Sequence, residues 1–215
     1  MKIGKIRNGI VGGLVLLAGG CGEIMERIRP DSIQMGVVSR RMRGRFQGAK
    51  VDKNIPLRRF EFNKELDGKF GKEFGLKNAE IYLRLDQNSG RVGAEHSVFS
   101  TNVKGSFESL GFGLKYFFLE SGELEPRIGV GFGGEVYRAE YDMNGSFCGF
   151  KRKTSDSFWG VGVCGEIIGE IPIDEKISIT GSLGYNATKI LSSSRASVNL
   201  DGVNWYVGIR IELGN

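Results

Sequence analysis

The sequence predicts an all-β fold, an antiparallel up-and-down transmembrane barrel of about eight strands. Residues 203–215 alternate almost without fault between apolar and polar side chains, the period of a strand with one oily and one polar face. Glycine supplies 34 of the 215 residues and proline only 4, which favours closely approaching strands over helices or linkers. An export-type leader precedes the strands, so we expect the oily faces to contact lipid.

Seven further segments alternate in the same way. They lie near residues 32–46, 78–86, 91–100, 107–119, 124–140, 157–171 and 176–188. Tight turns rich in Gly, Ser, Asn, Asp and Pro are expected at 87–90, 120–123 and 172–175, and longer links at 47–77, 101–106, 142–154 and 190–201. Alternating tight and long connections are typical of a membrane barrel. Phe60 and Phe62 also alternate as in a strand, and a further strand there would break the even count.

The first twenty residues have the pattern of a secretory signal. A basic start precedes an apolar run over 10–17, which is too short to span a bilayer. The run leads into Ala18-Gly19-Gly20-Cys21, which resembles the lipobox of bacterial lipoproteins; the resemblance implies acylation of Cys21. Plain secretion and an uncleaved leader are the alternatives. We expect a signal peptide over 1–20, a periplasmic tether over 21–31 and a barrel domain over 32–215.

The charge distribution and the leader indicate an exported protein and argue against a nucleic-acid partner. The formal net charge is +5, but three bases lie in the leader, so residues 21–215 carry +2. Acids and bases are interspersed there, whereas nucleic-acid binding needs Lys and Arg clustered on one face. Gly22 after the cysteine resembles an outer-membrane sorting signal. The expected location is the bacterial outer membrane, with a lipid anchor at the N-terminus.

Aromatic residues fall where a membrane barrel carries its two interfacial girdles. On oily strand faces, Trp159, Tyr185 and Trp205 are expected near the external strand ends. Tyr116 and Phe118 are expected near the periplasmic end of their strand. The general preference of aromatic residues for strands is the alternative explanation.

The C-terminal strand carries the sharpest match to a known family. Residues 206–213 read Tyr-Val-Gly-Ile-Arg-Ile-Glu-Leu, which is similar to the assembly signal of outer-membrane barrels, although the chain ends on Asn215 and not on an aromatic residue. From Ser32 to Leu213 the chain resembles the small eight-stranded outer-membrane barrels related to the OmpA-type transmembrane domain. The resemblance implies that Gly208–Leu213 is recognised by the barrel-assembly machinery.

The polar strand faces predict a charged interior. The interior of an eight-stranded barrel is just wide enough for side chains to fill it, so acids and bases there must pair. We expect a salt-bridge network in the lumen, with a narrow polar path as the alternative. Glu166 and Glu170 lie about 13 Å apart at strand rise, too far for a catalytic pair. The expected members of this network are Glu80, Arg84, Lys115, Arg127, Glu135, Glu166, Glu170, Arg210 and Glu212.

No catalytic, cofactor or metal site is predicted. His96 is the only histidine, and its neighbour Ser97 points to the opposite face of the expected strand. One His and three Cys, with Cys21 used by the leader, make a zinc site improbable. Cys148 and Cys164 would form a disulfide in an oxidising compartment if the loop that carries Cys148 folded into the barrel. Two reduced thiols are the alternative.

The long links supply the candidate interaction surface. Residues 47–77 and 147–153 interleave Lys and Arg with Phe, which favours contact with lipopolysaccharide phosphates; a solvated loop is the alternative. The sequence therefore predicts an outer-membrane lipoprotein barrel with a structural, anchoring or surface-interaction role and no catalytic activity. The alternatives are a soluble periplasmic lipocalin-like barrel that binds an apolar ligand, a narrow channel, and a lipid-modifying barrel enzyme.

Overall fold

A computed structural model describes residues 29–46, 49–66, 78–93, 101–119, 125–147, 150–192 and 196–213. The chain divides into two compact units, Met1–Pro30 and Asp31–Asn215, and every described strand lies in the second. Cys21, His96 and Cys148 lie outside the described residues, as do the leader and the turn expected at 120–123. Among the described residues there is no helix long and apolar enough to cross a membrane.

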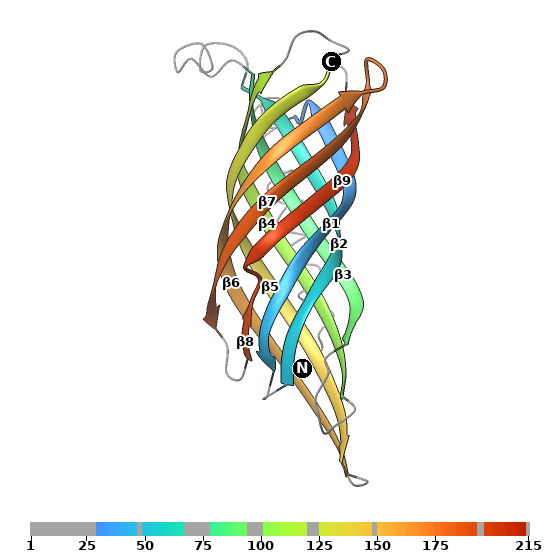
Figure 1. Cartoon of the computed structure of the whole chain (residues 1–215), viewed down its shortest axis with the longest axis vertical. Helices are drawn as coiled ribbons and strands as arrows, with labels where there is room; N and C mark the ends of the chain where they lie inside the picture. Colours follow the sequence, from blue (N-terminus) through green and yellow to red (C-terminus); the bar gives the residue numbers. More distant parts are fainter. Residues whose placement is uncertain are drawn as a thin grey trace. The chain divides into compact units, whose positions relative to one another are not determined.

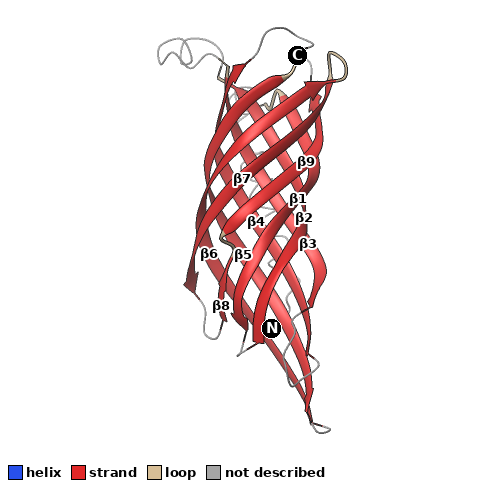
Figure 2. Ribbon diagram, viewed as in Figure 1, coloured by secondary structure: helices blue, strands red, loops and turns tan. Residues whose placement is uncertain are grey.

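The strands of the second unit form one antiparallel sheet that closes on itself (Figures 1 and 2). Each strand from β1 to β6 pairs with the next one along the chain, and β9 pairs with both β7 and β1. β8 pairs with β1 beyond the end of β9, so β8 and β9 together make the eighth strand of the wall. The predicted fold class, an antiparallel up-and-down barrel of eight strands, is confirmed. The strands are β1 (Ser32–Phe46), β2 (Ala49–Glu65), β3 (Ala79–Gly93), β4 (Thr101–Leu119), β5 (Arg127–Phe147), β6 (Phe150–Pro172), β7 (Ile177–Ser192), β8 (Ala196–Asn199) and β9 (Gly202–Glu212).

Two predictions of strand position are wrong, and the errors cancel in the strand count. β2 lies inside the segment 47–77, which the sequence analysis assigns to a long link. β3 runs through residues 87–90, where a tight turn is predicted, and so joins two segments predicted as separate strands. Residues 87–90 pair one by one with β4, because the ladder of backbone hydrogen bonds outweighs the turn preference of their side chains.

The strands on one side of the wall are longer than predicted. Residues 101–106 belong to β4, and the pairing of β5 with β6 continues to Phe147 and Phe150, well into the link predicted at 142–154. The turn predicted at 172–175 is present. There the Asp174 carboxylate accepts hydrogen bonds from the backbone N–H groups of Lys176 and Ile177, at 2.8 and 2.7 Å, as turn-forming Asp residues do.

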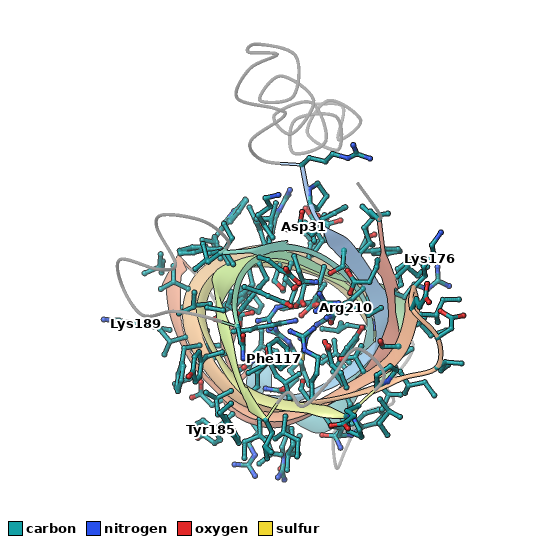
Figure 3. All side chains as sticks on the ribbon, turned by 90° about the horizontal axis from the view of Figure 1, so that it is seen from above. Asp31, Phe117, Lys176, Tyr185, Lys189 and Arg210 are labelled. Carbon is teal, nitrogen blue, oxygen red and sulfur yellow. The ribbon has the colours of Figure 1, made fainter. Side chains whose placement is uncertain are left out.

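The alternation of side chains divides the wall into an apolar outer face and a polar inner face. Large apolar side chains stand exposed on the outer face of the barrel strands, among them Phe112, Phe132, Val163, Leu183 and Val207. Figure 3 looks into the barrel and shows Arg210 and Phe117 inside the ring of strands, with Tyr185 and Lys189 outside it. The aromatic residues expected on oily faces all point outward: Trp159, Tyr185, Trp205, Tyr116 and Phe118.

Three tyrosine rings lie flat against glycines on the inner face. A Cβ built on Gly133 or Gly113 would lie 2.1 or 2.6 Å from the Tyr82 hydroxyl oxygen, and one on Gly160 would lie 2.1 Å from the Tyr137 ring. Tyr206 covers Gly208 in the same way. Glycine is required at these positions because the tyrosine ring occupies the space of a Cβ. At Gly113, Gly133 and Gly208 a backbone carbonyl oxygen of the neighbouring strand also occupies it.

Asp31 connects the start of the first barrel strand to the end of the last one. Its backbone carbonyl accepts a hydrogen bond from the Leu213 N–H at 2.8 Å, next to the last strand, and its own N–H donates to Asn63 at 2.8 Å on β2. Its carboxylate also accepts from Lys64 at 2.8 Å. The first and last barrel strands therefore begin and end at the same rim.

Candidate functional site

The centre of the lumen holds a tightly connected group of charged side chains. Arg40 of β1 donates two hydrogen bonds to the Glu135 carboxylate, at 2.8 and 2.6 Å, and a third to Asp86 at 2.8 Å. Arg59 of β2 donates to both oxygens of Asp86, at 2.8 and 3.1 Å. All four side chains are at most 2% exposed. Buried charges in this arrangement are neutralised by fork-shaped contacts that only arginine makes.

Two further residues extend this central group across the barrel. Arg84 of β3 lies 3.7 Å from both Glu135 and Glu166, and Arg59 lies 3.7 Å from Glu166. Glu166 also accepts a hydrogen bond from Ser182 of β7 at 2.8 Å. The central group therefore ties β1, β2, β3, β5, β6 and β7 together. Its members are Arg40, Arg59, Arg84, Asp86, Glu135 and Glu166.

A second group lies nearer the rim that carries Asp31. Arg210 of β9 donates to both oxygens of Glu80, at 2.8 and 2.9 Å, and to Glu170 at 3.3 Å. Arg127 lies 3.1 Å from Glu80 and 3.4 Å from Glu170. Glu212 accepts from the Arg210 Nε at 2.5 Å. Lys115 of β4 pairs with Glu61 of β2.

All nine residues predicted to face the lumen occupy inner positions of the wall and form ion pairs there. Four further charged residues of the lumen are not among the predicted ones: Arg40, Arg59, Glu61 and Asp86. Asp86 has the same strand parity as Glu80 and Arg84, so the pattern that identifies them also identifies it. Arg59 and Glu61 lie on β2, where a long link is predicted, and Arg40 lies on β1, whose alternation is irregular.

The same error misplaced part of the predicted interaction surface. Arg59, expected in an external loop, is buried in the lumen. Phe60 and Phe62 belong to β2 and lie on the outer face of the wall, with Phe60 41% exposed. Arg58 is exposed at the outside of β2. Residues 67–77 of that segment lie outside the described residues.

Cys164 is a free thiol inside the barrel. Its sulfur accepts a hydrogen bond from Arg84 at 3.3 Å and lies 3.5 Å from the Tyr82 hydroxyl. Cys148 lies outside the described residues, so its disulfide with Cys164 stays a prediction.

An apolar layer fills the lumen on the far side of the central group. Its main members come from four strands and the β8–β9 connection: Met42, Ile55, Leu57, Phe107, Phe158 and Leu200. The Phe107 and Tyr137 rings stack with centroids 5.9 Å apart, and the Arg40 guanidinium lies 5.8 Å from the centre of the Phe107 ring. This layer differs from the polar interior that the strand faces predict.

The chemistry of the lumen is that of paired charges. Each buried carboxylate described above contacts at least one Arg or Lys, so none stands apart as a general base. No group of three or more His, Cys, Asp or Glu residues within the described ranges could hold a metal ion. The fold and site together define a closed antiparallel barrel with an apolar exterior and an ion-paired interior. The resemblance to small eight-stranded outer-membrane barrels is thus confirmed at the level of the fold.

No protein-family model and no curated protein matches the sequence. Among solved structures, the chain is similar to Ail, the attachment invasion locus protein of Yersinia pestis, in complex with the heparin analogue sucrose octasulfate. The identity is 17%, the match covers 84% of this chain and 97% of that chain, and the TM-score is 0.42. Neisserial surface protein A is 9% identical over 85% of this chain and 96% of that chain, with a TM-score of 0.49. The outer membrane protease OmpT from Escherichia coli is 10% identical over 86% and 97%, with a TM-score of 0.45.

Proposed function

We propose that this protein is an outer-membrane β-barrel lipoprotein with a structural, anchoring or surface-interaction role. The observation that carries the proposal is the apolar outer face of the closed wall. Exposed Phe, Val, Ile and Leu side chains cover it, with Phe132 64% and Val163 63% exposed. Soluble proteins rarely expose a continuous apolar surface of this extent, whereas a membrane barrel requires one.

The ion-paired interior argues against the soluble alternative. A lipocalin-like barrel would place its apolar faces inward around a ligand cavity. Here the inner face carries Arg40, Arg84, Glu135 and Glu166 in mutual contact, and the apolar side chains of the same strands point outward. Such an interior supports a rigid scaffold, because removing a member leaves its partners buried with fewer ion pairs.

The rim at Asp31 gives the barrel a direction in the membrane. A lipid anchor at Cys21 would hold the N-terminal tether on the periplasmic side, so β1 would begin there. The β1–β2 hairpin would then lie outside the cell, where Arg41 and Arg43 have side chains 42% and 53% exposed. Both arginines face the single carboxylate of Asp52, so the group keeps a net positive charge that suits the phosphates of lipopolysaccharide. Gly208–Leu213, at the Asp31 rim, would be available to the assembly machinery in the periplasm.

The first experiment compares the full-length chain with Cys21→Ser by palmitate labelling, cell fractionation and alkaline-carbonate extraction. We expect both variants to stay in the outer membrane after carbonate, and only the wild type to incorporate palmitate. Release of Cys21→Ser by carbonate would refute the transmembrane barrel. Failure of the wild type to incorporate palmitate would refute the anchor and leave the barrel standing.

A further inference from the structure

The last wall strand is interrupted where it passes the apolar layer. Asn199 of β8 pairs with Arg43, and Trp205 of β9 pairs with Ser39. Residues 200–204 therefore lie opposite residues 40–42, so the last strand carries two extra residues at this point. Gly202 takes a φ of 136°, a conformation that other residues rarely adopt. Such bulges redirect a side chain.

The side chain redirected by the interruption is Leu200. It is 2% exposed and packs into the apolar layer together with Met42, Ile55 and Phe107. A regular strand would have continued the pairing with β1 and placed a different residue here. The interruption thus adds one apolar side chain to the layer.

Side-chain hydrogen bonds to β7 hold the interruption in place. The Asp201 carboxylate accepts hydrogen bonds from both the backbone N–H and the hydroxyl of Thr188. The Thr188 hydroxyl in turn accepts from the Leu200 N–H at 3.0 Å. These contacts fix the backbone at the start of the bulge, at Leu200 and Asp201, so the position of Leu200 is set by the fold.

The charged groups and the apolar layer oppose ions differently. The charged part of the lumen contains buried polar atoms without a protein partner, among them the Ser32 hydroxyl and the Asn63 amide, and buried polar atoms of this kind bind water. In a hydrated, charged region, a passing ion can take the place of one partner of an ion pair. Apart from the hydroxyls of Tyr137 and Tyr206, the side chains of the apolar layer are hydrocarbon or thioether groups. Such groups offer an ion nothing in place of its hydration shell and oppose passage by excluding water.

We infer that the apolar layer is the ion barrier of the barrel. The β8–β9 interruption completes this barrier by holding the Leu200 side chain in the lumen. The inference rests on the proposed membrane location. On this inference the apolar layer, and not the salt bridges, prevents ions from passing through the lumen. Loosening the packing of Leu200 would open a narrow path for small ions.

The test is ion flux across vesicles that contain the full-length protein. Leu200→Ser is compared with Leu183→Ser, a matched change on the outer face, where Leu183 is 58% exposed. We expect wild type and Leu183→Ser to leave vesicles as tight as empty ones. Leu200→Ser should raise K⁺ flux at least about tenfold, which corresponds to roughly 1.4 kcal/mol off the barrier. Vesicle flotation confirms incorporation, so failure to insert, which refutes the proposed function, is distinguished from a closed barrel.

Folding is checked by circular dichroism in the same vesicles. If Leu200→Ser is folded, inserted and as tight as the wild type, the inference is overturned. If it does not fold, two other variants are measured. Phe158→Ser perturbs the same layer from β6, and Leu200→Met keeps the side-chain volume at position 200. Flux through folded Phe158→Ser with a tight Leu200→Met supports the inference, and a tight Phe158→Ser overturns it.

Discussion

At the scale of single residues, neighbouring arginines on β1 have opposite roles. Arg40 points into the lumen, is 1% exposed and pairs with Asp86 and Glu135, whereas Arg41 points outward and pairs with Asp52. Arg40→Met would leave Glu135 buried without its bidentate partner and Asp86 with one arginine partner fewer. We expect a loss of about 3–5 kcal/mol in the free energy of unfolding, measured by urea titration in lipid vesicles.

Arg41→Met is the matched control for this prediction. Its side chain is 42% exposed, and surface ion pairs of this kind contribute little because water screens them. We expect the unfolding midpoint of Arg41→Met to stay close to that of the wild type. Equal losses for the two variants would show that the luminal pairs do not stabilise the barrel.

The exposed pair is visible instead through its titration. The hydrogen bond from Arg41 lowers the pKa of the Asp52 carboxyl below its ordinary value of 3.8. Because this pKa is lower in the folded than in the unfolded state, the stability that the contact contributes is fully present above the ordinary pKa. That contribution is lost as the pH falls through the lowered pKa. In an NMR titration, we expect the Asp52 midpoint to rise in Arg41→Met. An unchanged midpoint would contradict the contact.

At the scale of the elements, a tyrosine ring explains why β6 needs glycine at one position and not at another. The three atoms nearest to a Cβ at Gly160 would all belong to Tyr137, at 2.1 to 2.6 Å, whereas a Cβ at Gly169 would meet nothing within 4 Å. We expect Gly160→Ala to destabilise the barrel by about 1–3 kcal/mol, as overpacking does, and Gly169→Ala to have little effect. Urea unfolding of both variants measures the difference.

A double variant separates the ring contact from a general effect of alanine on β6. In Gly160→Ala/Tyr137→Leu the ring that blocks the new methyl group is gone. We expect the two changes to be strongly non-additive, with the double variant less destabilised than the sum of the single ones. Additive losses would mean that Tyr137 is not the reason for glycine at position 160.

The elements also show how far the sequence can predict the fold. Regular apolar and polar alternation identified most of β4 to β7 and β9, because one period fixes both the strand and its faces. β2 is not predicted as a strand, because its N-terminal half carries Lys, Arg and Pro56 in place of an apolar face. β3 was divided because Asn88-Ser89-Gly90 favours a turn in isolation, and pairing with β4 is a long-range effect that the local sequence does not contain.

The interior was predictable in its chemistry but not in its layering. The parity of a strand places Glu80, Arg84 and Glu166 inside, and the need for pairing follows from their burial. The apolar layer depends on which strand ends meet across the lumen. It also depends on a bulge that brings Leu200 inward, and neither is a property of a single strand.

At the scale of the whole molecule, the solvent around the wall decides the cost of a charge on its outer face. Val163 lies on the outer face of β6 and is 63% exposed. In water, Val163→Arg would be an ordinary surface substitution, within about 0.5 kcal/mol of neutral. In a bilayer, an arginine near the midplane of a barrel costs about 2–4 kcal/mol, because the guanidinium must leave water. We therefore expect Val163→Arg to lower the unfolding free energy in lipid vesicles by that amount. Glu175→Arg, in the exposed β6–β7 turn, is the control and should change it by at most about 1 kcal/mol. Equal, small effects at the two positions would show that the oily face does not contact lipid, and the location in the outer membrane would have to be abandoned.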